Sequence, residues 1–180
     1  MTIDKDFSFS RYGMSVRMVE EKDAEFIVRL RTDKKLSRYL HETNPDVEKQ
    51  RDWIREYKKR ENDGLEYYFL YYSEKEKLGV SRIYNILNDR EATGGSWICP
   101  PTNTMEQSIG TLLFGRDVFF EVLNFNLEHF QVSKGNNQVL NFHKRMGAEI
   151  VSENDIEYEM IMLKENYLRK REKLIKLLYL

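Results

Sequence analysis

Apolar residues recur along this chain with a period of two in some stretches and of three to four in others. The first period is typical of half-buried strands, and the second of helices that bury one face. Alternation, or a short aromatic run, predicts strands over residues 15–19, 67–72, 78–87, 93–99, 127–132, 148–151 and 156–162. Helical spacing predicts helices over residues 24–32, 34–40, 45–61, 109–123, 139–146 and 164–180. An α/β (α+β) protein is therefore expected.

Turn and stop residues indicate how these elements connect. Charged turns at residues 73–77 and 88–90 separate the three strands of the middle, which favours an antiparallel meander. Pro100 and Pro101 end the third of these strands, because proline has no N–H to donate to a sheet. Gly147 ends the helix before it, because glycine adopts the left-handed conformation without steric cost.

Composition and charge narrow the class of protein. The 180 residues suffice for one domain with its own core, and 41% hydrophobic with 33% charged residues is typical of a globular chain. The net charge of −1 gives no broad positive surface, so no nucleic-acid partner is expected. No apolar run approaches the ~20 residues that cross a bilayer, and the polar N-terminus has no signal-peptide core. A cytoplasmic protein is therefore expected.

Few residues are suited to a disulfide or a metal site. Cys99 is the only cysteine, which excludes an intramolecular disulfide and a cysteine-based metal site. The histidines His41, His129 and His143 are scattered without metal-ligand spacing. No metal is therefore expected.

A spaced motif lies between the strand at 127–132 and the strand after Gly147. Asn137 is followed, without a gap in spacing, by Phe142, His143 and Gly147. This stretch resembles the late motif of the GNAT acetyltransferases, which reads Asn, then five residues on an apolar residue, then an aromatic residue, two mostly charged residues, an aliphatic residue and Gly. The family most often has Tyr where this chain has His143.

The element order supports the same resemblance. Residues 14–163 follow the order β-α-α-β-β-β-α-β-α-β, which is similar to that of the GNAT fold. The resemblance implies one acyltransferase-like domain over residues 1–180, with a mixed, mostly antiparallel central sheet flanked by helices. The extra C-terminal helix over residues 164–180 is basic, with a narrow apolar face. Docking on its own domain or on a second subunit is therefore favoured over a membrane.

The resemblance also implies acetyl-coenzyme A as co-substrate. The pyrophosphate would then be held by Gln107, Ser108, Ile109, Gly110 and Thr111. Gln107 and Gly110 match the family's phosphate motif, and helix N-termini bind anions through free N–H groups. Leu112 stands where the family has a second small residue. The alternative is an ordinary helix start capped by Ser108.

Two further contacts with the co-substrate follow from the resemblance. The backbone of Trp97, Ile98 and Cys99 would pair with the pantetheine arm, and Asn137 would lie beside it. His143 would protonate the departing thiolate, which suits a side chain that exchanges protons near neutral pH. The alternatives are a His143 that only packs on the helix face and a Cys99 that is a small core residue.

A narrower resemblance concerns the acceptor. Segments 30–40 and 50–54 are similar to the GNAT subgroup that includes ribosomal-protein and nucleotide-sugar acetyltransferases, and segments 84–85 and 95–97 look more like the amino-sugar branch. The substrate-binding residues would then be Arg31, Tyr39, Tyr84, Asn85 and Trp97. Guanidinium groups suit phosphates and aromatic rings suit a base or a sugar.

The resulting hypothesis is an N-acetyltransferase that acts on a primary amine, preferably of a nucleotide-linked amino-sugar in surface-polysaccharide synthesis. The alternatives are acetylation of a protein N-terminus and a non-catalytic binding module of the same fold. The general base stays unassigned among four candidates, Glu66, Glu91, Glu106 and Glu128. A homodimer is an open alternative to a monomer.

Overall fold

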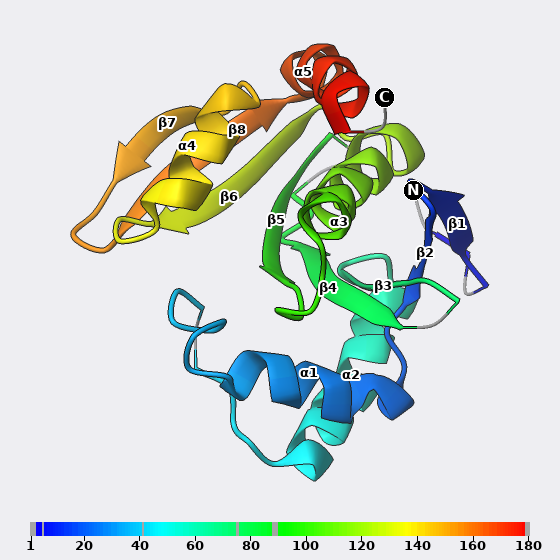
Figure 1. The fold of residues 1–180 in the computed structure, drawn as a ribbon. Coiled ribbons are helices and arrows are strands. Elements are labelled where there is room, and N and C mark those ends of the chain that lie inside the picture. Colours follow the sequence, from blue (N-terminus) through cyan, green and yellow to red (C-terminus); the bar gives the residue numbers. More distant parts are fainter. Residues whose placement is uncertain (1–2, 5, 41, 75, 88–89, 179–180) are drawn as a thin grey trace.

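An eight-stranded sheet organises the chain in the computed structural model, which describes residues 3–4, 6–40, 42–74, 76–87 and 90–178 (Figure 1). In sheet order the strands are β1 (Ser8–Arg11), β2 (Met14–Met18), β3 (Tyr67–Tyr72), β4 (Lys77–Tyr84), β5 (Glu91–Ile98), β6 (Leu127–Ser133), β8 (Glu157–Leu163) and β7 (Glu149–Glu153). The helices are the 3-10 turn η1 (Glu21–Asp23), α1 (Ala24–Thr32), α2 (Val47–Asn62), α3 (Met105–Asp117) with its π-helical extension η2 (Val118–Val122), α4 (Asn137–Arg145) and α5 (Lys164–Leu178).

The sheet is mixed but mostly antiparallel. Each described pair of neighbouring strands is antiparallel except β5 and β6, which run parallel. The expected fold class and the meander of β3, β4 and β5 are therefore confirmed.

Helices cover both faces of the sheet, which explains the aromatic run in β3. Tyr67, Phe69 and Tyr71 pack in the cluster to which α3, α4 and α5 contribute, whereas Tyr68 and Leu70 pack in the cluster under α1 and α2. A strand buried on both faces reads as a continuous apolar run rather than as an alternation.

The first strand was not expected from the sequence. β1 is four residues long and only Phe9 in it is apolar, so it carries no clear alternation. It pairs with β2 through a tight turn in which Tyr12 and Gly13 have φ of +58° and +70°. Two successive positive φ values are typical of the two-residue turns that join antiparallel strands.

The helix expected over residues 34–40 is wrong, because local hydrogen bonds replace it with turns. Oδ1 of Asp33 accepts from the backbone N–H groups of Lys35 (2.8 Å) and Leu36 (3.2 Å). The Ser37 hydroxyl donates to the Asp33 carbonyl oxygen at 2.8 Å. Asp and Ser side chains that bond the backbone in this way compete with helix formation.

Several boundaries also differ from expectation, and two of these differences have a clear local cause. β4 ends at Tyr84 rather than near residue 87, since Asn85 has φ of +49° and cannot continue the strand. α3 begins at Met105 rather than near residue 109, because Thr104 caps it. His41 and residues 88–89 of the expected turn lie outside the described residues.

The C-terminal helix docks on its own domain, as expected. The Tyr167 hydroxyl donates to Oδ1 of Asp117 (2.7 Å) and lies 2.8 Å from the Leu113 carbonyl oxygen. Leu168, Leu174 and Ile175 pack against the core, while the side chain of Leu178 lies outside the described part of the chain. None of the described helices is long and apolar enough to cross a bilayer. The homodimer stays a prediction.

Candidate active site

Strands β5 and β6 diverge after a short parallel contact, and the candidate active site lies where they part. Their paired residues are Glu91 with Leu127, Ala92 with Glu128 and Thr93 with His129. Beyond these pairs the two strands separate (Figure 1). A cavity of about 550 Å³ lies there, with walls from β4, β5, β6, α3, α4 and the segment after α1.

A β-bulge shapes the β5 wall of this cavity. Ser96 and Trp97 of β5 together stand opposite Ser81 of β4 alone, and Ser96 has φ of +53°. A bulge leaves its extra residue outside the ladder of backbone hydrogen bonds. Since Ser96 and Trp97 both line the cavity, their backbone is placed where a ligand could pair with it.

Three buried polar side chains form the cavity floor. Arg116 of α3, Glu128 of β6 and His143 of α4 are 4%, 7% and 7% exposed. Nε of Arg116 donates to Oε2 of Glu128 at 2.7 Å. Oε1 of Glu128 lies against Gly94, where an added Cβ would be 2.2 Å from that oxygen. Among the described residues no group donates to Oε1, so one carboxylate oxygen is available to a ligand.

His143 is neutral in this setting. Nη1 of Arg116 lies 3.2 Å from Nδ1 of His143, and a guanidinium can only donate, so the ring proton is on Nε2. Burial first, and the charge of Arg116 second, lower the pKa of His143 well below 6.5. The role of thiolate acid stays a prediction, and this pKa argues against it, because little imidazolium exists at pH 7.

The depressed pKa of His143 predicts a loss of stability in acid. An unfolded histidine binds a proton near pH 6.5, whereas folded His143 binds one only at lower pH. Below pH 6.5 the unfolded chain therefore holds more protons, and the free energy of unfolding falls as the pH decreases, by at most about 1.4 kcal/mol per pH unit. Urea unfolding of the wild type and of His143→Phe between about pH 7.5 and 5.5 measures this slope. The dependence of the free energy of unfolding on pH should be weaker in the variant. Equal slopes in the two proteins would assign this dependence to another titratable group.

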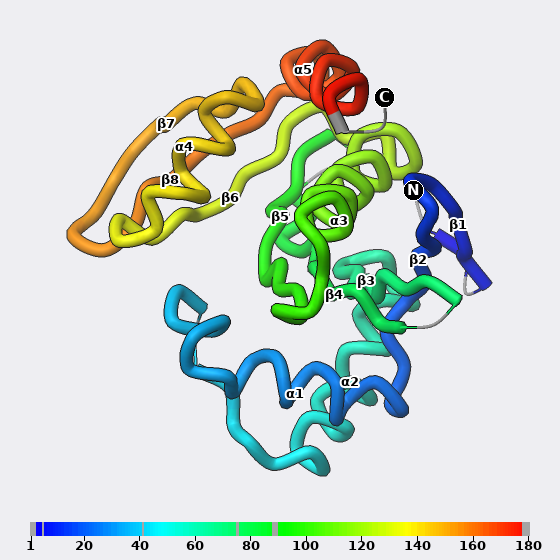
Figure 2. The backbone as a smooth tube through the Cα atoms, viewed as in Figure 1, coloured from blue at the N-terminus to red at the C-terminus, as the bar shows by residue number. Residues whose placement is uncertain are grey.

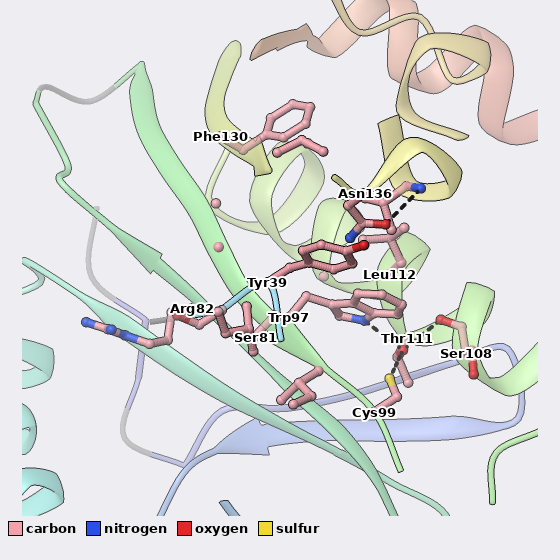
Figure 3. A pocket seen from close by; sticks show the side chains of 18 of the residues that line it. Tyr39, Ser81, Arg82, Trp97, Cys99, Ser108, Thr111, Leu112, Phe130 and Asn136 are labelled. Carbon is pink, nitrogen blue, oxygen red and sulfur yellow. Dashed lines mark hydrogen bonds between the residues drawn. The ribbon is translucent and has the colours of Figure 1, made fainter. Parts of the chain in front are cut away.

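Thr111 joins the β5 wall to α3 (Figure 3). Its hydroxyl accepts from Nε1 of Trp97 (3.1 Å), donates to the Ser108 carbonyl oxygen (2.9 Å) and lies 3.2 Å from Sγ of Cys99. Burial raises the pKa of the Cys99 thiol to about 12. Cys99 is therefore a protonated thiol at neutral pH rather than a nucleophilic thiolate.

Gln107 lies inside α3 rather than before it. The Thr104 hydroxyl accepts from the Gln107 N–H (3.2 Å), and the Gln107 side chain accepts from the Thr104 N–H (2.8 Å). The Ser108 N–H already donates to the Thr104 carbonyl oxygen. The N–H groups of Met105 and Glu106 have no acceptor within the helix backbone. A hydrogen bond from its own N–H first, and the Thr104 hydroxyl second, lower the pKa of Glu106, so its carboxylate lies over this helix start.

In Figure 2 the segment after α1 points toward the turn between β6 and α4, and the Tyr39 side chain contacts that turn. The Tyr39 hydroxyl donates to the Gly135 carbonyl oxygen at 2.7 Å, and Nη2 of Arg38 donates to that hydroxyl at 2.6 Å. In the same turn Asn136 caps α4 and lines the cavity, whereas Asn137 is exposed.

The structure brings together about half of the expected site residues. Those that line the cavity are Tyr39, Trp97, Ile98, Cys99, Ser108, Thr111 and His143. Those outside its lining are Gln107, Ile109, Gly110, Asn137, Tyr84 and Asn85. Arg31 lines a second cavity of about 330 Å³. Arg82 lies on the walls of both cavities.

Of the four carboxylates considered as the base, Glu128 lines the cavity. Glu66 is held between Arg60 and Arg82, Glu91 lies 3.2 Å from Nε2 of His129, and Glu106 is exposed at the start of α3. Within the described ranges, no cluster of three His, Cys, Asp or Glu side chains is suited to a metal ion.

Sequence reasoning missed Arg116, Arg82 and Asn136. A charged residue inside the apolar pattern of α3 is a signal that could have singled out Arg116, since buried charges need partners. Asn136 directly precedes α4, where an Asn is favoured as a cap. No comparable signal marks Arg82.

Comparison with known proteins identifies a family and a related structure for this fold. The family model "Acetyltransferase (GNAT) domain" matches residues 14–149. The chain is similar to FdhC, described as a nucleotide-linked sugar GNAT, with 35% identity, coverage of 96% of this chain and 98% of that chain, and a TM-score of 0.84. No curated protein sequence matches the chain.

A more distant relative shares the fold alone. Spermidine N-acetyltransferase from Vibrio cholerae, solved in complex with CoA and spermine, is 20% identical, with coverage of 88% of this chain and 99% of that chain and a TM-score of 0.72. Because the family model spans most of the chain and the similarity to FdhC extends over nearly all of it, the protein is an N-acetyltransferase that belongs to the GNAT family.

Proposed function

We propose that this protein transfers the acetyl group of acetyl-coenzyme A to the primary amine of a nucleotide-linked amino-sugar. The nucleotide-linked sugar of the FdhC description suggests this acceptor, and the charge of the cavities supports it independently.

The charge around the two cavities carries the proposal. The charged side chains that line the main cavity are Lys35, Arg38, Arg82, Arg116 and Glu128. Those that line the second cavity are Arg31, Lys49, Arg82 and Glu42. Each set has one carboxylate among several cations, although the whole chain has a net charge of −1. Such a site attracts phosphates and repels polycations.

This charge separates the proposed acceptor from the alternatives. A polyamine carries several positive charges and would need carboxylates where this chain has Lys35, Arg38 and Arg82. A protein N-terminus brings no required negative charge, so these cations would have no function in its recognition. A nucleotide-linked sugar carries a diphosphate, for which guanidinium groups are well suited.

The crevice supports acetyl-coenzyme A, which GNAT enzymes use as co-substrate, as the acyl donor. The bulge at Ser96 and the gap between β5 and β6 give an extended pantetheine arm backbone to pair with. The N–H groups of Met105 and Glu106 would meet the pyrophosphate, and the Glu106 carboxylate would have to move aside. Leu112 lies two turns into α3, so we expect it to contact the arm rather than block the helix start.

Direct transfer needs one proton to leave the acceptor amine. The amine nitrogen attacks the thioester carbonyl carbon, a C–N bond forms, and the C–S bond breaks to release a thiolate. We assign the amine's proton to Oε1 of Glu128, because this residue lines the cavity and Oε1 accepts no hydrogen bond from the described residues. Arg116 holds this carboxylate through Nε, and the neutral His143 holds Arg116 from the other side.

A rate comparison with four amines tests the acceptor. Release of free thiol from acetyl-coenzyme A is measured with a nucleoside-diphosphate amino-sugar, with the same amino-sugar lacking the nucleotide, and with spermidine. We expect kcat/KM to be at least about 100-fold higher for the nucleotide-linked amine, because a charged site left unpaired by a smaller substrate loses several kcal/mol. A peptide with a free N-terminus serves as the fourth amine. Equal or faster turnover of spermidine or of the peptide would overturn the proposed acceptor.

A further inference from the structure

The second cavity lies between α1, α2 and the sheet, next to the main cavity. Its lining residues are Arg31, Glu42, Thr43, Asn44, Lys49, Gln50, Trp53, Tyr68 and Arg82. Its volume of about 330 Å³ falls in the size range of small-molecule sites, about 300–1,000 Å³. The acetyl and proton transfer proposed above use none of its side chains.

Arg82 connects the two cavities. It belongs to β4, lines both cavities, and in Figure 3 its guanidinium points away from Trp97 and Thr111. Nε of Arg82 donates to Oε1 of Glu66 at 2.7 Å, which fixes the direction of the side chain. A ligand that extends from the main cavity past Arg82 therefore enters the second one.

The charge of the second cavity suits a diphosphate. Glu66 is shared between Arg82 and Arg60, so one carboxylate faces two guanidinium groups. Lys49 has no carboxylate within ion-pair distance among the residues that the structure describes. Nε of Arg31 donates to Oγ1 of Thr43 at 2.6 Å, which holds it at the same wall. Two guanidinium groups that share one carboxylate, with Lys49 nearby, form a preorganised anion site.

The remaining lining suits a nucleobase. Trp53 stacks on Tyr57 with ring centroids 5.7 Å apart, and the Arg82 guanidinium lies 5.0 Å from the Trp53 ring centroid. Aromatic rings and stacked guanidinium groups are platforms for bases. The Asn44 and Gln50 side chains offer the amide donors and acceptors that match the edge of a base.

We propose that the second cavity binds the nucleoside diphosphate portion of the acceptor, with the base near Trp53 and the diphosphate near Arg82 and Lys49. This assignment rests on the proposed function, since it locates the nucleotide of the same acceptor. It goes beyond that function because it divides the substrate between two cavities: the amine lies over Glu128, and the nucleotide lies between α1 and α2. Arg82 is then the residue that spans the junction of sugar and diphosphate.

Lys49→Glu tests the location with little risk to folding, because Lys49 is exposed. Calorimetric titration with UDP and TDP should show binding to the wild type, and the variant should bind at least about tenfold more weakly. The matched control is Lys59→Glu on the same helix, whose lysine pairs with Glu56 and does not line the cavity. The control should bind like the wild type.

Kinetics separate this inference from the proposed function. Lys49→Glu should raise KM for the nucleotide-linked amine about tenfold and leave KM for acetyl-coenzyme A unchanged. The effect should vanish with the amino-sugar that lacks the nucleotide. If the nucleotide-linked amine is the preferred acceptor but its KM is unchanged by Lys49→Glu, the proposed function stands and the location is overturned.

Coenzyme A also contains a nucleotide with a diphosphate, so its nucleotide end is the other ligand that the second cavity would suit. Titration of both variants with ADP and with coenzyme A distinguishes it. Equal weakening of coenzyme A and UDP by Lys49→Glu would assign the second cavity to the co-substrate and overturn the inference. Coenzyme A binding that is unchanged, with weakened UDP binding, supports it.

Discussion

Glu128→Gln is expected to lower kcat about 10²–10⁴-fold at pH 7, the usual contribution of a general base. Glu128 is 7% exposed and lines the cavity; its Oε1 lies against Gly94, and its Oε2 accepts from Arg116 at 2.7 Å. A glutamine keeps the shape and still accepts from Arg116, but it takes no proton from the amine. The KM for acetyl-coenzyme A should change little.

The pH dependence of the lower kcat of Glu128→Gln gives a second test of Glu128 as the general base. As the pH rises toward the pKa of the acceptor amine, more of the amine is already deprotonated and needs no base. The ratio of wild-type to variant kcat should therefore shrink between about pH 7 and 9.5. A group that only shapes the cavity would give a constant ratio over this range.

Folding has to be checked in the same experiment, because Arg116 is 4% exposed and loses its charged partner. Removing one member of a buried ion pair typically costs about 3–5 kcal/mol. Glu128→Asp keeps the charge and withdraws the carboxylate by one methylene, so it should fold and still be slow. Glu91→Gln, on the neighbouring strand and outside the cavity lining, is the matched control and should retain wild-type kcat. A folded Glu128→Gln with kcat within threefold of wild type would remove Glu128 from the mechanism.

Asp117→Ala is expected to cost about 3–5 kcal/mol of unfolding free energy. Asp117 at the end of α3 is fully buried and accepts from the hydroxyls of Tyr12 (2.6 Å) and Tyr167 (2.7 Å). It also pairs with Arg11 and Arg171, each at 2.6 Å. One carboxylate thus joins α3 to the β1–β2 turn and to α5, and its loss leaves several donors without their acceptor.

Thermal melting and urea unfolding measure this loss. At roughly 2–4 °C per kcal/mol for a domain of this size, Tm should fall by about 6–20 °C. Glu121 still pairs with Arg11 and Arg171 in the variant, so the loss of unfolding free energy should lie toward the lower end of this range. Asp52→Ala is the control: Asp52 is exposed and pairs with Arg55 on the helix surface, where such pairs contribute about 1 kcal/mol or less. A loss below about 1 kcal/mol for Asp117→Ala would show that this junction is not a stabilising centre.

The sequence by itself determined the fold class and, apart from β1 and the helix expected over residues 34–40, the element order. These follow from local signals, such as hydrophobic periodicity and the strand end at Pro100, and the spacing from Asn137 to Gly147 carried the resemblance to the family. The same local reasoning was wrong over residues 34–40, where side-chain bonds of Asp33 and Ser37 prevent the expected helix. Periodicity reports which face of an element is buried, but it does not report hydrogen bonds between side chain and backbone.

The chemistry of the candidate site was decided by the tertiary structure. Arg116, Glu128 and His143 come from α3, β6 and α4, and nothing in the sequence indicates that they meet. Packing places Glu128 in the cavity lining, which is why we propose it as the base, and burial with the nearby guanidinium lowers the pKa of His143. The placement of Arg82 between two cavities is likewise a product of packing α1 and α2 against β4. Burial and charge proximity depend on residues far apart in the chain, so a pattern read along the chain does not contain them.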